Sequence, residues 1–457
     1  MAPINRTLLF TIRKYVNSSV LLTLATLLAL LFANLPATRE LYKEVWDMPV
    51  SLSIGGFNLF SHNGHAMSLM AFINDFLMAL FFLCVGLEIK REILCGELST
   101  RQKAMLPIIG ACGGMLIPVM IFYAVCAGHP MMERGCAIPM ATDIAFSLGV
   151  LSVFGKRVPV GLKIFLAALA VADDLGGIIV IALFYTSHMA WHYLVGAACI
   201  VCILLYFNHR GIRTKGVYLG LGLVLWYMVL NSGIHATIAG VVLAFCIPAN
   251  LGKGTRFYLQ RIRKLALEYP EIEVSEADRK KTIVISKDDI QLLRSIEKSS
   301  DHLISPLQDM EDNLSIPVNN IIIPLFAFAN AGIDFEGMSF MNLFHGVALG
   351  VFLGLFVGKF LGVLGFSWLS MKLGICRMPG GADWRSFASV CMVCGIGFTV
   401  SMFIAALSYL PVADMGGAEF LNEAKLGILT GSVASGLFGC ILLNWSLPKG
   451  EVAKSEE

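Results

Sequence analysis

The strongest constraint on this chain is its series of long apolar runs, each close to the length that crosses a lipid bilayer as a helix. The hydrocarbon core of a bilayer is about 30 Å thick, so a spanning helix needs about 20 apolar residues. Twelve runs approach this length, and they predict an all-α polytopic membrane protein with twelve transmembrane helices. Their ranges are 17–35, 67–88, 105–127, 137–154, 160–184, 191–208, 216–231, 233–249, 317–332, 344–370, 386–409 and 425–446.

The composition agrees with this class and excludes others. Hydrophobic residues make up 57% of the 457 residues and charged residues 14%, whereas a soluble domain carries roughly 25% charged residues. The net charge is only +2, so we expect no nucleic-acid partner. We also expect no cofactor. Cys199/Cys202 and Cys391/Cys394 have the spacing of a redox or metal site, but no further ligands lie near them in sequence, which favours simple packing inside membrane helices.

The distribution of lysine and arginine gives the orientation. With twelve spans, 29 of the 34 basic residues fall on one side of the membrane and 4 on the other. Cytoplasmic loops carry the excess of basic residues, so both termini are predicted to be cytoplasmic. The predicted organisation is a cytoplasmic N-terminus at 1–16, spans one to eight at 17–250, a cytoplasmic loop at 251–316 with helix near 288–299, spans nine to twelve at 317–446, and a cytoplasmic C-terminus at 447–457.

Residues 50–60 predict a small extramembrane β-hairpin. Apolar residues alternate on both sides of Gly55-Gly56, which is the pattern of two strands joined by a two-residue turn. An isolated hairpin is only marginally stable in water. We therefore expect this hairpin to pair with another surface.

A few ionisable residues fall inside the predicted spans: Asp75, Asp143, Asp173, Asp174 and Lys359. Such groups are expensive in a membrane and usually mark function. Asp173 and Asp174 lie near the middle of the fifth span, and consecutive helix residues point about 100° apart. Lys359 is about 15 Å from the inner end of its span, too deep to remain charged without a buried anion. Because the acids outnumber the lysine, at least one carboxylate is left to bind a proton or a metal cation.

Helix-breaking residues interrupt the fourth and eleventh spans. Pro139 precedes Thr142 and Asp143 in the fourth, and Gly395 and Gly397 lie in the eleventh. Spans three to five and ten to twelve have opposite orientations, so they predict inverted repeats. Interrupted helices at matching places in inverted repeats are typical of a midplane ion site. Close helix packing is the alternative explanation for the glycines.

Eight motifs between about residues 20 and 445 share their sequence with one known family: Ile73–Asp75, Val85–Glu92, Ala141–Phe146, Asp173–Gly176, Ser232–Thr237, Pro324–Gly332, Gly358–Lys359 and Cys394–Thr399. By these motifs the chain resembles the NhaA-type sodium/proton antiporters of bacteria. The resemblance implies an electrogenic Na⁺(Li⁺)/H⁺ antiporter of the inner membrane, working by alternating access in pH and sodium homeostasis. It implies a secondary active transporter, not an enzyme.

The same resemblance assigns roles to residues. Na⁺ or Li⁺ would bind transiently at Asp174, Asp173 and Asp143, with Thr142 beside them and Lys359 paired with Asp173. The residues matched to pH response are Glu88, Glu92 and His235; Asp75 is a further intramembrane acid, and the 50–60 hairpin matches a dimerisation element.

Two departures separate this chain from the family pattern. Phe360 follows Gly358-Lys359 where the family often has proline, and Leu314–Pro317 replaces a Leu-His-Pro-Trp motif after a loop some 40 residues longer than expected. These differences concern local helix geometry and cytoplasmic regulation. Two other functions are alternatives: an intramembrane aspartyl protease, whose Gly-x-Gly-Asp motif is absent from this sequence, and a cation channel or symporter.

Overall fold

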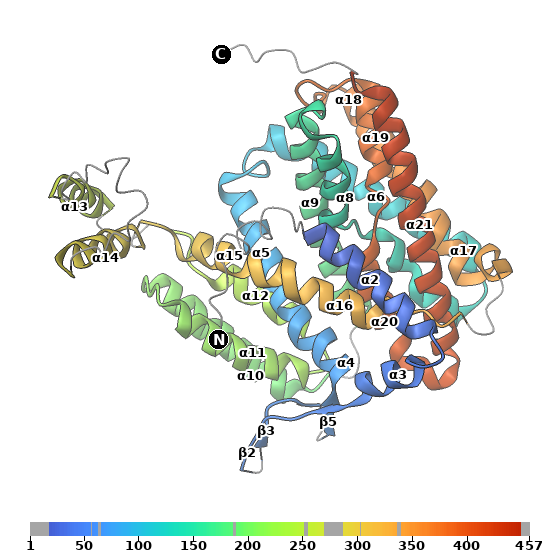
Figure 1. Ribbon diagram of the computed structural model, residues 1–457, viewed down its shortest axis with the longest axis horizontal. Helices are drawn as coiled ribbons and strands as arrows, with labels where there is room; N and C mark the ends of the chain where they lie inside the picture. Colours follow the sequence, from blue (N-terminus) through green and yellow to red (C-terminus); the bar gives the residue numbers. More distant parts are fainter. Residues whose placement is uncertain are drawn as a thin grey trace, which may run out of the picture.

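The computed structural model describes residues 18–55, 57–62, 65–185, 189–250, 255–268, 287–301, 303–335 and 340–448. The predicted N-terminal segment 1–16, and the C-terminal segment beyond 448, lie outside the described residues. Figure 1 shows a bundle of long helices, with the short strands and α3 at one end and the α18–α19 connection at the other. The fold is therefore the mostly helical one that the apolar runs predict.

Every predicted span contains helix in the described part of the chain. Six helical segments are long and apolar enough to cross a membrane, and three further bent pairs raise the number to nine. The exact count of twelve and the repeats stay predictions. The six are α4–η1–α5 (Leu69–Cys95), α6 (Arg101–Cys126), α9 (Val160–Phe184), α10 (Trp191–His209), α17–η7–α18 (Gly346–Lys372) and α21 (Gly417–Ser446).

The remaining elements are shorter. The bent pairs are α2 (Ser18–Asn34) with α3 (Arg39–Asp47), α7–η2 (Pro130–Met140) with α8 (Ile144–Val153), and α19 (Trp384–Val393) with α20 (Phe398–Tyr409). Shorter apolar helices are α11 (Lys215–Leu230), α12 (Thr237–Cys246), and η5 (Val318–Ile322) continuing into α16 (Ile323–Asn330). Short 3₁₀ segments are η3 (Gly155–Arg157), η6 (Phe340–Phe344) and η8 (Leu410–Met415).

Glycines allow two pairs of helices to approach closely. A Cβ at Gly362 of α18 would lie 2.2 Å from the backbone oxygen of Gly113 in α6, and one at Gly240 of α12 would lie 2.2 Å from that of Ala79 in α5. In lipid the hydrophobic effect does not hold helices together, so membrane helices associate by close packing, which small residues such as glycine allow. The α6–α18 contact fixes the position of Lys359, the first residue of α18.

The two predicted interruptions are present in the structure. η2 ends at Met140, residues 141–143 are non-helical, and α8 begins at Ile144. In the second interruption α19 ends at Val393 and α20 begins at Phe398. The backbone N–H of Asp143 donates to the carbonyl of Ile396 at 2.7 Å, so the two breaks touch each other and cross.

The predicted hairpin is confirmed, but it is shorter than residues 50–60. β2 (Ser53–Ile54) pairs antiparallel with β3 (Phe57–Asn58), in the register Ser53↔Asn58. Gly55 has φ +63°, which favours glycine in this turn. The flanking residues belong to a second sheet in the order β1 (Pro49–Val50), β5 (His65–Ser68) and β4 (Ser61–His62).

Helices also occur in the predicted cytoplasmic loop. α13 (Thr255–Glu268) and α14 (Lys287–Asp301) pack on each other, and Figure 1 shows them side by side, apart from the bundle. α14 covers the region near 288–299 for which the sequence predicts helix. α15 (Pro306–Pro317) then leads back into the bundle and contacts α5.

Candidate functional site

A buried ion pair lies where α9 and α18 meet. The Asp173 and Lys359 side chains are both fully buried, and the Lys359 ammonium contacts Asp173 Oδ2 and also the carbonyl oxygen of Met140. The π-helical turn η7 (Gly354–Gly358) directly precedes Lys359. The buried anion that the depth of Lys359 demands is therefore Asp173.

Thr142 joins this pair from the first helix break. Its Oγ1 lies 2.7 Å from Asp173 Oδ2 and 3.0 Å from the carbonyl oxygen of Cys394, so its one proton serves either acceptor. The other carboxylate oxygen, Asp173 Oδ1, is buried and has no hydrogen-bond donor among the described residues. Asp173 is thus well held on one side and unsatisfied on the other.

Asp143 occupies the crossing of the two interrupted helices. Its Oδ1 accepts from the Phe146 N–H at 3.1 Å, and its Oδ2 accepts from the Thr399 N–H at 3.0 Å and the Thr399 hydroxyl at 2.6 Å. These donors belong to the first turns of α8 and α20. Helix N-termini carry a partial positive charge and unpaired N–H groups, so one carboxylate stabilises both.

The opposite helix ends meet the complementary groups. The carbonyl of Met140, at the C-terminal end of η2, accepts from the Lys359 ammonium, and the carbonyl of Cys394, just after α19, faces the Thr142 hydroxyl. A cation near helix C-termini is favourable for the same electrostatic reason. The crossing therefore combines two buried carboxylates, those of Asp143 and Asp173, with the buried Lys359 ammonium and with backbone carbonyl oxygens that face it or Thr142.

Asp174 is the carboxylate in this cluster that keeps its oxygens free. It is 5% exposed, and no hydrogen-bond donor among the described residues reaches it. Asp173, Glu88 and Asp143 are the negative groups near enough to act on it, and Lys359 is the positive one. A buried carboxylate without donors is stabilised by a proton or by a metal cation. Carboxylate and carbonyl oxygens are the ligands that hard cations prefer.

The residues matched to pH response lie in two separate places. At the C-terminal end of α5, Glu92 accepts from the Glu97 N–H at 2.9 Å and lies 3.3 Å from Arg91, and Glu88 is half-buried one turn earlier. His235 lies between α11 and α12, on the wall of a cavity at the end of the bundle that holds the strands. The structure does not bring His235 together with the two glutamates.

Glu311 of α15 belongs to the group at this end of α5, and its role could not be read from the sequence alone. Its carboxylate lies 3.1 Å from the Arg91 guanidinium and is almost fully buried. Burial raises the pKa of Glu311 from 4.5 to about 7, although Arg91 opposes the shift. The available signal was Ser305-Pro306, an N-cap followed by proline at N1, which predicts a helix start here and makes Glu311 part of a docked helix.

Two cavities lie near opposite ends of the bundle. The cavity at the end that holds the strands has a volume of about 1280 Å³, and its lining includes Glu133, Arg134, Asp75, His235 and Met140. Because the carbonyl of Met140 holds Lys359, this cavity reaches the edge of the crossing.

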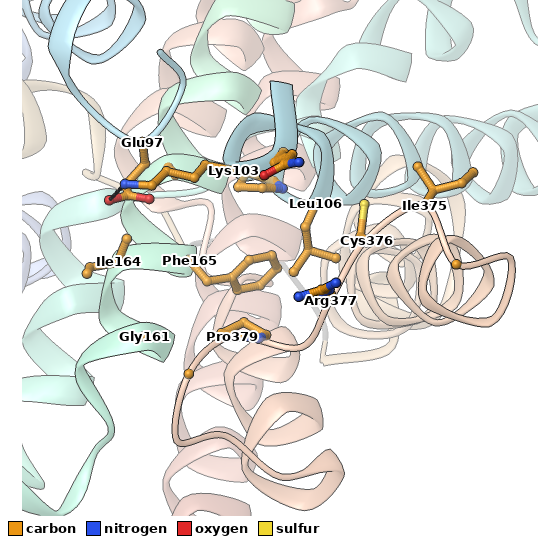
Figure 2. Close-up of a pocket in the computed structure, with 15 residues that line it drawn as sticks. Glu97, Lys103, Leu106, Gly161, Ile164, Phe165, Ile375, Cys376, Arg377 and Pro379 are labelled. Carbon is orange, nitrogen blue, oxygen red and sulfur yellow. Dashed lines mark hydrogen bonds and ion pairs between the residues drawn. The ribbon is translucent and has the colours of Figure 1, made fainter. Parts of the chain in front are cut away.

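The other cavity has a volume of about 660 Å³ and lies between α6, α9 and the α18–α19 connection. Figure 2 shows the Lys103 side chain extended toward Glu97, with which it forms an ion pair at 3.4 Å, and Arg377 near Leu106. Its lining residues do not include the buried carboxylates. This cavity is therefore separate from the cluster around Asp174.

Comparison with known proteins agrees with these features. A family model described as Na⁺/H⁺ antiporter 1 matches residues 10–443. Proteins named Na(+)/H(+) antiporter NhaA are similar over most of their length: one from Bacteroides fragilis is 49% identical over 95% of this chain and 96% of its own. The protein of that name from Phocaeicola vulgatus is 50% identical over 95% of both chains, and that from Pectobacterium carotovorum is 40% identical over 96% of both.

Proposed function

The chain belongs to the Na⁺/H⁺ antiporter 1 family and is a transporter rather than an enzyme, and we propose that it exchanges sodium ions for protons at Asp174. The observation that carries this assignment is the free carboxylate of Asp174, which lies buried beside an ion pair and two broken helices. A proton and a sodium ion compete for the same oxygens, so binding one releases the other. This competition couples the two fluxes without any covalent step.

In this proposal the neighbours of Asp174 have distinct roles. Asp173 joins the cation site with its unsatisfied Oδ1, and Lys359 balances its charge when sodium is absent. Thr142 and backbone carbonyl oxygens of the two breaks would add neutral ligands. Asp143 already accepts three hydrogen bonds. Its negative charge therefore attracts the cation from a distance, and Asp143 would bind the ion directly only after losing one of these hydrogen bonds.

The proposal also includes an electrogenic cycle in which more positive charge enters as protons than leaves as sodium. Lithium, a smaller hard cation, would use the same oxygens. Alternating access would expose the site first to the cytoplasm and then to the cavity at the strand end of the bundle, through inverted repeats formed by spans three to five and ten to twelve. The protein would lie in the bacterial inner membrane with cytoplasmic termini, and work in sodium and pH homeostasis.

The decisive experiment uses Asp174→Asn in proteoliposomes. This variant keeps the size and polarity of the side chain but cannot carry the charge, so sodium-driven proton movement should fall to the level of empty liposomes. Asp47→Asn, a matched change on the exposed surface of α3, should exchange at the normal rate. Normal exchange by Asp174→Asn would refute the site.

The same assay separates antiport from a channel. An antiporter alkalinises an acidic lumen when sodium is added outside, even with the membrane potential clamped at zero. A cation channel would instead pass sodium without moving protons under the clamp, and that result would overturn coupled exchange.

A further inference from the structure

The helix pair α13–α14 has one face already used for packing. The half-buried residues of α13 are Tyr258, Ile262 and Leu265, whose spacings of four and three place them on one side of the helix. Leu292 and Ile296 are half-buried on α14, which packs on α13. These residues form the contact between the two helices, so the opposite side of α13 faces away from α14.

The outward side of α13 mixes exposed apolar and cationic residues. Phe257, Leu259 and Leu267 are 59%, 53% and 79% exposed. Arg256, Arg261 and Arg263 are also exposed and form no ion pair with any described residue. At about 100° per residue, Arg256 and Arg263 lie within about 40° of Leu267, on the side opposite Tyr258. Leu259 lies on one flank of this side, and Phe257 and Arg261 lie on the other. Large apolar residues exposed to water beside unpaired arginines are unfavourable unless another surface covers them.

Charge and position indicate what that surface is. α13 carries four basic residues and one acidic residue, whereas α14 carries three basic and four acidic ones. α13 also begins at Thr255, nine positions after α12 ends at Cys246. Nine residues span at most about 30 Å, which keeps α13 close to the membrane end of α12. Basic amphipathic helices just inside a membrane span bind the anionic surface of the cytoplasmic leaflet.

We propose that α13 is an interfacial anchor that lies flat on the inner leaflet and binds anionic phospholipids. Its arginines contact lipid phosphates, while Phe257, Leu259 and Leu267 enter the boundary between headgroups and acyl chains. This inference relies on the cytoplasmic placement of residues 251–316 proposed above. Each arginine should contribute about five-fold to the binding constant, the equivalent of about 1 kcal/mol, and salt should weaken the contact by screening.

The test is amide hydrogen exchange of the full-length protein in nanodiscs. We expect exchange in α13 to be at least ten-fold slower in phosphatidylglycerol-containing discs than in phosphatidylcholine alone, and the difference to shrink at high salt. The variant Arg256→Gln/Arg261→Gln/Arg263→Gln should lose the difference. The matched control, Arg294→Gln/Lys298→Gln on α14, should keep it.

Several results of the same experiment would overturn lipid binding by α13. Equal exchange in both lipids would overturn the proposal, as would protection that persists in detergent, because the protein itself would then cover α13. Slowing by an added acidic protein but not by anionic lipid would point to a protein partner and also refute it. Nanodiscs expose both faces of the bilayer, so the result does not depend on membrane orientation, and Asp174→Asn should show the same lipid effect even though it does not exchange ions.

Discussion

At the scale of single residues, the unusual feature is that Asp173 is only half satisfied. Lys359 and Thr142 serve one oxygen, and the other is buried without a donor in the described part of the chain. A buried ion pair stabilises a protein little more than a well-packed apolar pair would. Removing one partner, however, strongly destabilises it, because the other charge is left buried without compensation. Retaining such a pair beside a free carboxylate is expected if Asp173 changes partner during transport.

The variant Lys359→Gln tests this exchange of partners. Removing the ammonium should cost about 3–5 kcal/mol of stability if Asp173 stays charged, and much less if Asp173 takes up a proton. Adding Asp173→Asn to the same chain should recover most of the lost stability. Thermal unfolding of both variants in detergent gives the comparison. Equal stability of Lys359→Gln and the unaltered protein would argue against a charged pair.

The same variant distinguishes two roles for the lysine in transport. If Lys359 releases a proton when Asp173 binds sodium, Lys359→Gln should fold but exchange without responding to an imposed membrane potential. If the lysine only neutralises Asp173, the exchange of the variant should still follow the voltage. Proteoliposomes with a potassium diffusion potential make this measurement, and we expect the first result.

Part of this site could be predicted from the residues themselves. The depth of Lys359 required a buried anion, and the structure supplies Asp173. The sequence could not show that Thr142 and the Met140 carbonyl share this pair, because both contacts depend on how two distant helix breaks cross. The resemblance pointed to Asp174 as the central cation-binding acid, but the residues themselves do not show which carboxylate keeps its oxygens free.

At the scale of elements, the two broken helices depend on one shared cap. Asp143 accepts from the first turns of both α8 and α20, and the Thr399 hydroxyl supplies the shortest of these bonds at 2.6 Å. A cap that bridges two helices fixes the angle at which they cross. Local changes at this point should therefore affect transport as well as stability.

The variant Thr399→Val keeps the side-chain shape and the backbone N–H but removes the hydroxyl donor. A hydrogen bond to a charged group contributes about 1.5–3 kcal/mol, so unfolding should become easier by about that amount and exchange should slow. Thr23→Val on α2, whose exposed hydroxyl bonds only its own helix, is the control. No loss of stability in Thr399→Val beyond that control would contradict a shared cap.

The contact of α15 with α5 predicts a pH dependence. Because burial raises the pKa of Glu311 from 4.5 to about 7, the folded protein favours the protonated form. The resulting stability is fully present below about pH 4.5 and is lost as the pH rises through about 7. Above that pH the ionised carboxylate faces the Arg91 cation, with Glu88, Glu92 and Asp312 as its negative neighbours.

Glu311→Gln removes this titration. We expect the exchange rate to change less steeply between pH 6 and 8 in the variant, by about one titrating proton, and the thermal stability to depend less on pH across the same window. Asp309→Asn on the same helix, whose partner is Lys215, should keep the original profile. An unaltered profile in Glu311→Gln would exclude Glu311 as the titrating group.

At the scale of the whole molecule, the apolar runs located every helix of the bundle but not its finer shape. Helix occurs within all twelve predicted ranges, since a bilayer-length apolar run has few other stable forms. The 111° size of the bend between α2 and α3 was not predictable, although Pro36 marks its place in the sequence. The π-helical turns η1, η5 and η7 were not predicted either. η1 contains Asn74, which forms a buried 2.9 Å hydrogen bond with Asn330 of α16, and local sequence does not encode such a contact between distant segments.

The last prediction concerns assembly. The β2–β3 hairpin consists of two two-residue strands, Ser53–Ile54 and Phe57–Asn58, and so few residues are not stable alone. Phe60 must be left in place, because its ring packs at 5.0 Å from Phe72 and 5.5 Å from Phe76 in the bundle. Val50 likewise pairs with Met67 in the second sheet. Deleting residues 53–58 therefore removes the free hairpin while sparing the fold.

If the hairpin pairs with that of a second protomer, this deletion should weaken a homodimer and leave each protomer able to exchange sodium for protons. Edge strands that carry unpaired N–H and carbonyl groups join readily with another chain, and two copies would complete one larger sheet. Native mass spectrometry in mild detergent should show monomers at concentrations where the unaltered protein is dimeric. Proteoliposomes should show the same exchange per protomer.

Dimers that persist after the deletion would place the interface elsewhere, whereas loss of exchange in a folded monomer would mean that pairing supports the transport core itself.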